Sequence, residues 1–132
     1  MDGTIPRSQL GHVLSEMKKM SEEFGLAVAN VFHAGDGNLH PLILFDANKP
    51  GEFERTEAFG GRILELCVEV GGAITGEHGV GLEKLRYMPA QFGEEELMQF
   101  QGIKEAFDNE GTLNPGKGVP VLKRCQEYRA LD

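Results

Sequence analysis

Residues 26–45 read LAVANVFHAGDGNLHPLILF, two apolar runs on either side of a turn rich in Gly, Asp and Asn. The first run, residues 26–32, is too short for a helix and is bounded by glycine, which predicts a buried strand. Residues 42–45 predict its partner. Because Gly, Asp and Asn accept the backbone conformations that reverse a chain, the two runs are expected to form an antiparallel hairpin.

Segments with helical periodicity lie before and after this hairpin. Residues 8–24 place apolar side chains three or four positions apart, with Ser8 as the expected N-cap and Gly25 as the stop. A second apolar face runs from Phe53 to Val70, a short helix is expected between Val80 and Pro89, and residues 94–108 predict a further helix. The prediction is an α+β fold, an antiparallel hairpin covered by three to four helices. Two strands alone make a marginal sheet, so we expect a piece of a larger structure.

Composition narrows the functional classes. The chain has 132 residues, 40% of them hydrophobic, which is enough for one domain. Its net charge of -8 disfavours nucleic acid and anionic membranes as partners. No apolar run approaches the roughly 18 residues of a membrane span. Cys67 and Cys125 have neither metal nor redox spacing, and a cytoplasmic location is expected.

His33 and His40 lie on either side of the hairpin turn. If they are directly opposed, their Cβ atoms are about 4.5–5.5 Å apart, which lets both imidazoles bind one metal ion. Glu77, in a second glycine-rich loop, is the best source of a third ligand. Its neighbour His78 points in a different direction in an extended segment and is left for proton transfer.

Each of these residues also has a simpler interpretation. Histidines in strands are more often hydrogen-bonded structural residues than ligands. Glu77 is also explained as a carboxylate at the start of a helix, where the helix dipole favours it. A helix beginning near Val80 would direct backbone N–H groups at an anion, and a substrate carboxylate suits that place.

Four segments, taken in order, carry a family resemblance: DGTIPR at residues 2–7, HAGDGNLH at 33–40, GEHGVG at 76–81 and NPGK at 114–117. Together they resemble the C-terminal region of FAD-linked oxidases of the vanillyl-alcohol-oxidase type, the group that includes the glycolate oxidase D-subunit and D-lactate dehydrogenases. The likeness covers nearly the whole chain. It implies a fragment of a ferredoxin-like cap domain, with residues 1–108 as the latter part of the cap and residues 109–132 as a C-terminal tail.

The resemblance also implies roles. His33, His40 and Glu77 match ligands of a divalent metal, usually zinc, and His78 matches the proposed catalytic base. Asn114 matches an asparagine that returns to the flavin, and FAD itself is held mainly by a domain absent from this chain. The implied reaction is oxidation of a small D-2-hydroxy acid to a 2-oxo acid. The isolated chain is therefore expected to be inactive.

Two other functional classes fit the same residues. The first is a free-standing module that binds a divalent metal without flavin. The second is a split subunit that docks on a separate flavoprotein through an exposed strand edge. Such an edge is a template for pairing and would equally allow a homodimer. A strict monomer in size-exclusion chromatography at high concentration would count against both forms of edge pairing.

Overall fold

The computed structural model describes residues 1–120, so Cys125 lies outside the described residues. The chain divides into two compact units, Met1–His78 and Gly79–Asp132. Within residues 1–120, no helix is both long and apolar enough to cross a membrane. The cytoplasmic location stays a prediction.

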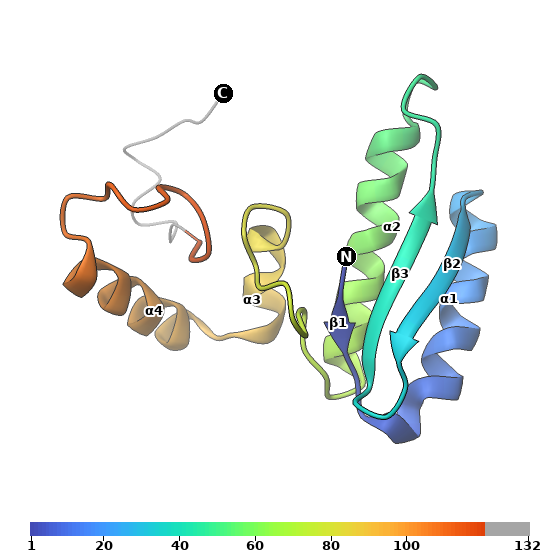
Figure 1. Cartoon of the computed structure of the whole chain (residues 1–132), viewed down its shortest axis with the longest axis horizontal. Coiled ribbons are helices and arrows are strands. Elements are labelled where there is room, and N and C mark those ends of the chain that lie inside the picture. The colour runs from blue at the N-terminus through green and yellow to red at the C-terminus, as the bar shows by residue number, and fades with distance from the viewer. Residues whose placement is uncertain (121–132) are drawn as a thin grey trace. The chain divides into compact units, whose positions relative to one another are not determined.

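The first unit is built on a three-stranded antiparallel sheet in the order β1-β3-β2 (Figure 1). The expected hairpin is present as β2, Ala27–His33, and β3, Asn38–Leu44. The third strand, β1, is short, Gly3–Thr4, and Thr4 also bridges to Ala73. This bridge brings the chain after the second long helix alongside the N-terminal strand. The predicted α+β class is confirmed.

Two helices cover one face of this sheet, as Figure 1 shows. They are α1, Leu10–Phe24, and α2, Glu52–Glu69. Gly25 ends α1 in the left-handed conformation, as predicted, because glycine accepts a positive φ without a steric penalty. The core between helices and sheet contains mainly residues from the predicted apolar faces: Val13, Met17, Met20, Leu39, Phe59, Ile63, Leu66 and Cys67.

Two local expectations in the first unit were wrong. Ser8 is not an N-cap, because it lies inside a 3-10 turn, η1, Arg7–Gln9, which the Gln9 N–H closes on the Pro6 carbonyl. Gln9 therefore precedes α1, without a capping side-chain hydrogen bond. Phe53 is 53% exposed, because it lies in the first turn of α2, where its ring is tilted against that of Phe45 instead of entering the core.

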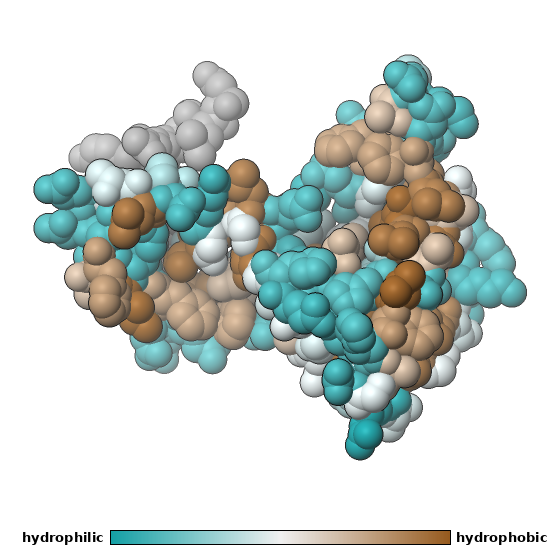
Figure 2. Space-filling view, in the orientation of Figure 1, coloured by the Kyte–Doolittle hydropathy of each residue, from teal (hydrophilic) through white to brown (hydrophobic). Residues whose placement is uncertain are grey.

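The strand predicted to be buried is largely exposed. Helices cover only one face of the sheet, so the side chains that alternate to the other face meet no other element of the unit. The exposed apolar side chains of this open face include Val31, Leu42 and Leu44, and Figure 2 shows an apolar patch over β2 and β3. Among the described residues, β2 pairs only with β3, so its outer edge has no strand partner. A homodimer through this edge stays a prediction.

The second unit contains η2, Leu85–Tyr87, α3, Met88–Gln91, and α4, Glu94–Phe107. The helix expected to begin near Val80 is absent there, and residues 81–84 form turns. Pro89 does not end a helix. It lies in the first turn of α3, where its missing N–H has no helical partner to lose. In α4 Leu97 is buried, whereas Phe107 is 84% exposed, so the unit buries only part of the expected apolar face.

The end of α4 is held by a carboxylate. Asp108 accepts a hydrogen bond from the Lys104 ammonium and two more from the backbone N–H groups of Thr112 and Leu113. The Lys104 hydrogen bond, with help from the two backbone N–H groups, lowers the pKa of Asp108 to about 2. Since the unfolded pKa is near 3.9, the ionised form stabilises the fold fully above about pH 4, and this contribution is lost as the pH falls towards 2.

We expect the urea midpoint of the chain to fall more steeply in the wild type than in Asp108→Asn when the pH is lowered from about 5 to about 2. Asn keeps the size of the side chain but has no carboxylate to protonate. Asp36→Asn, which removes an exposed turn carboxylate, is the control and should follow the wild type. Equal pH dependence in the wild type and Asp108→Asn would contradict the assignment.

Candidate metal centre

The two histidines lie at the turn end of the hairpin, on the open face of the sheet. His33 is the last residue of β2 and pairs with Asn38, whereas His40 pairs with Val31. The expected direct opposition is therefore wrong. The turn is shorter than a direct pairing of His33 with His40 would require, and the Asp36 N–H donates a hydrogen bond to the His33 carbonyl within it. Because the register differs by two residues, both side chains still share one face, and their ring centroids are 5.4 Å apart.

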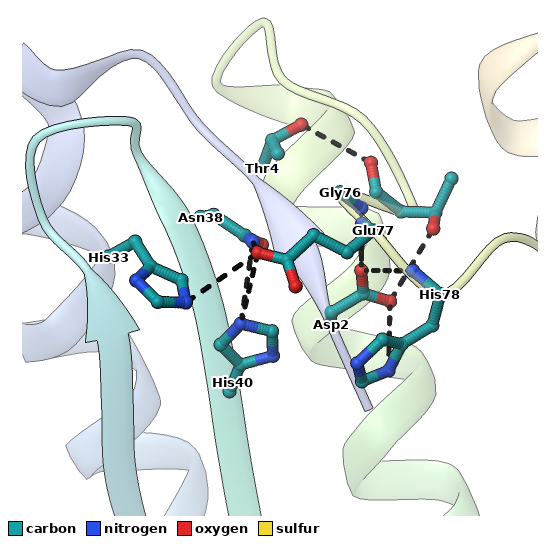
Figure 3. A network of polar contacts seen from close by, with 9 residues as sticks. Asp2, Thr4, His33, Asn38, His40, Gly76, Glu77 and His78 are labelled. Carbon is teal, nitrogen blue, oxygen red and sulfur yellow. Dashed lines mark hydrogen bonds and ion pairs between the residues drawn. The ribbon is translucent and has the colours of Figure 1, made fainter.

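Glu77 reaches these histidines from the loop that follows Ala73. Its Oε1 lies 3.6 Å from His33 Nε2 and 3.8 Å from His40 Nε2 (Figure 3). One ligand atom from each of the three residues lies within 4.8 Å of the others. His40 is the least exposed of the three, with a 16% exposed side chain against 60% for His33 and 54% for Glu77. The structure thus brings together the three predicted ligands and keeps solvent access to them.

His78 lies beside this triangle. Its ring is tilted against that of His40, with centroids 5.4 Å apart, and its Nδ1 is 3.8 Å from Asp2 Oδ1. The contact with Asp2 directs one ring nitrogen towards the protein. The side chain is 59% exposed, so solvent reaches it.

Asn38 joins the cluster, although its sequence context indicates only a turn. Asn38 is buried, with 5% of the residue exposed. Its Nδ2 donates a hydrogen bond to Glu77 Oε1 at 2.6 Å and lies 3.3 Å from His40 Nε2. Its Oδ1 is buried with no hydrogen-bond partner among the described residues. A Cβ at Gly76 would lie 2.3 Å from this Oδ1, so only glycine fits there. Because its Nδ2 donates to Glu77 Oε1, Asn38 orients the Glu77 carboxylate.

Asp2 is the second residue that the sequence did not assign to the site, although it begins the DGTIPR segment. It is fully buried, and its carboxylate accepts hydrogen bonds from the backbone N–H groups of Gly76, Glu77 and His78. These N–H groups lie in the loop where an anionic ligand was expected at a helix N-terminus. No helix begins near Val80, and the anion bound by the loop is a side chain of the chain itself. The helix N-terminus that would have directed N–H groups at a substrate carboxylate is therefore absent at Val80.

Asn114, expected to contact a flavin, lies in the second unit. It has a positive φ of 47°, and its carbonyl accepts the N–H of Lys117. Residues 114–117 therefore form a turn. The left-handed backbone conformation is one that asparagine accepts more readily than most side chains.

The chemistry of the donor set fits a divalent cation. Two imidazoles and one carboxylate are ligands of zinc in catalytic sites, where a further position stays open for water or substrate. Iron, manganese and cobalt accept the same set. The partial exposure of His33 and Glu77 leaves room for such an additional ligand. The unpartnered Asn38 Oδ1 is a further buried polar atom of the same site.

Comparison with known proteins gave a consistent set of relatives. The family model for FAD linked oxidases, C-terminal domain, matches residues 1–118. Glycolate oxidase subunit GlcD of Escherichia coli strain K12 is 61% identical over 131 residues, covering 99% of this chain and 26% of that protein. The subunit of the same name from Bacillus subtilis is 38% identical, and the match covers 88% of this chain and 25% of that protein. The mitochondrial D-lactate dehydrogenase [cytochrome] of Arabidopsis thaliana is 34% identical, and the match covers 90% of this chain and 21% of that protein. The chain spans about a quarter of the length of these relatives.

Proposed function

Because this chain belongs to the family of FAD linked oxidase C-terminal domains, we propose that it is the substrate- and metal-binding part of a flavin-dependent oxidoreductase. The proposed reaction is oxidation of a small D-2-hydroxy acid, of the glycolate or lactate type, to the 2-oxo acid. The observation that carries the proposal is the cluster of His33, His40 and Glu77 on the open face of the sheet. The names of the relatives support it, since glycolate and lactate are both 2-hydroxy acids.

In this proposal His33, His40 and Glu77 hold one divalent cation, with zinc as the first candidate. A bound divalent cation supplies Lewis-acid chemistry, which lowers the cost of removing a proton from a coordinated hydroxyl group. Asn38 keeps the carboxylate of Glu77 directed at the two histidines through its Nδ2 hydrogen bond. The exposed side of the cluster admits the hydroxy acid.

His78 is proposed as the base that accepts the hydroxyl proton. Its Nδ1 faces the Asp2 carboxylate, so Nε2 is the nitrogen that receives the proton. An imidazole is suited to this step because its ordinary pKa lies near neutrality. FAD, held mainly outside this chain, would supply the two-electron acceptor for the hydride equivalent released from the carbon atom. The carbon–oxygen double bond of the 2-oxo acid forms as the hydroxyl proton and the hydride equivalent leave.

The remaining part of the proposal concerns the rest of the protein. We assign residues 1–108 to the latter part of a cap domain and residues 109–132 to a C-terminal tail that returns to the flavin through Asn114. FAD is held mainly by a domain or subunit outside this chain. The open apolar face over β2 and β3 supports this assignment, because exposed apolar surface of this kind marks an interaction site.

In the full-length flavoprotein, His78→Ala is expected to slow flavin reduction by D-lactate or glycolate by about 10²- to 10⁴-fold, the usual contribution of a general base. Bound metal should remain at the wild-type level. Anaerobic stopped-flow absorbance of the flavin measures the rate. His12→Ala, which removes an exposed histidine on α1, is the control. Reduction of the flavin at the wild-type rate in His78→Ala would contradict the role of this residue.

A further inference from the structure

The strongest unexplained feature is a buried carboxylate at the start of the chain. Asp2 is 0% exposed, immediately before β1. Its Oδ2 accepts three consecutive backbone N–H groups, from Gly76 at 2.8 Å, Glu77 at 2.6 Å and His78 at 3.1 Å. The Thr75 hydroxyl donates to Oδ1 at 3.4 Å. Figure 3 shows the carboxylate next to the backbone of residues 76–78, with the His78 ring beside it.

Burial of the Asp2 carboxylate makes its hydrogen bonds to the loop necessary. A buried carboxylate is unfavourable unless hydrogen bonds satisfy it. Three successive N–H groups directed at one oxygen satisfy the charge and at the same time restrict the backbone between residues 76 and 78. This loop needs such a restraint, because it contains no helix or strand and Gly76 and Gly79 interrupt it.

The restrained segment carries both residues of the proposed chemistry. Glu77 extends towards the histidines and His78 lies beside Asp2, with Nδ1 3.8 Å from Oδ1. The two side chains leave the backbone in different directions. A shift of the backbone here therefore moves the proposed metal ligand and the proposed base together.

We propose that Asp2 is a positioning residue for the loop, holding the backbone of residues 76–78 so that Glu77 completes the metal cluster and His78 keeps its orientation. This inference rests on the proposed function for its consequence. The hydrogen bonds themselves are independent of any metal. The two parts are therefore tested separately, by amide exchange without metal and by cobalt binding.

The first experiment measures amide hydrogen exchange by NMR in the metal-free chain. Asp2→Ala should accelerate exchange at Gly76, Glu77 and His78 by at least about 10-fold, because these amides lose their acceptor. Asp2→Asn retains one carbonyl acceptor of the same size and should show a smaller acceleration. Amides within α2 serve as the internal reference for an intact fold. If Asp2→Ala unfolds the chain, the exchange rates of the same three amides in Asp2→Asn test the proposal instead.

The second experiment titrates Co²⁺ into each variant and follows its visible absorption. Asp2→Asn should bind Co²⁺ about 10- to 100-fold more weakly, as is usual when an outer-shell partner of a metal site is lost, with a shifted absorption band. Asp36→Asn removes a carboxylate from the turn between the two histidines without touching the loop, and is the matched charge control. It should bind within about twofold of the wild type, as expected for an exposed substitution.

The outcomes separate the two proposals. Unchanged exchange at residues 76–78 in Asp2→Ala overturns the positioning role whatever the metal result. Wild-type affinity and spectrum in Asp2→Asn overturn it as well. If His33→Ala binds Co²⁺ as tightly as the wild type, the proposed metal site fails, and the exchange result alone then decides whether Asp2 holds the loop.

Discussion

His33→Ala and Glu77→Gln should each lower the affinity of the chain for Zn²⁺ by more than about 100-fold, because each leaves two of three ligands at one cation. Glu77→Gln tests the charge most directly. Glutamine keeps the length of the side chain and an oxygen that can accept the Asn38 hydrogen bond, but it is a far weaker ligand. Equilibrium dialysis followed by elemental analysis gives the bound metal per chain.

The controls for this experiment lie on the same unit. His12→Ala removes an exposed histidine from α1, and Asp36→Asn removes a carboxylate from the hairpin turn. Both should retain the metal content of the wild type. Metal retained at the wild-type level in both His33→Ala and Glu77→Gln would remove the basis of the proposed centre. Loss of metal in His12→Ala would point to a different set of ligands.

Phe59→Ala is expected to lower the free energy of unfolding by about 3–5 kcal/mol, the usual cost of a large cavity in a core. Phe59 is fully buried in α2, and its ring stacks on that of Phe24 with centroids 5.2 Å apart and an interplanar angle of 12°. The pair joins α1 to α2, so the cavity opens between the two helices that support the sheet. Urea unfolding followed by circular dichroism measures the change.

Phe53→Ala is the matched control, since it removes the same side chain from the same helix at a position that is 53% exposed. Its cost should be below about 1 kcal/mol, because the exposed ring buries little area. Equal losses in Phe59→Ala and Phe53→Ala would show that exposure does not distinguish these positions and would contradict the described core. The comparison also tests whether the Phe53 ring lies outside the core.

The elements with a strong local pattern were predictable. The spacing of apolar residues in 10–24 and the following Gly25 predicted α1 and its end, since helix periodicity and the left-handed stop are short-range properties. The hairpin followed from the Gly-rich turn between two apolar runs. Burial was less predictable. Val31 in β2 is as apolar as a core residue, yet only a helix layer on its side of the sheet would bury it.

The register of the β2–β3 hairpin could not be predicted from the sequence, and this limited the prediction of the site. His33 and His40 were expected to be directly opposed, but the turn closes so that His33 pairs with Asn38. A two-residue change of register keeps each side chain on its face, because strand periodicity is two. The two histidines therefore share one face of the sheet, although they are not directly opposed as expected.

The α+β class, the hairpin and the candidate metal ligands could be predicted from the sequence alone, because they depend on periodicity and on chemistry carried within a few residues. The way in which Glu77 reaches the histidines, and the contacts that hold it there, depend on the tertiary structure. Asp2 and the loop it binds are 74 to 76 positions apart in the chain. Asn38 and Glu77 are 39 apart. No local pattern specifies such pairs, because the folding of β1 beside β3 and the return of the chain after α2 bring them together.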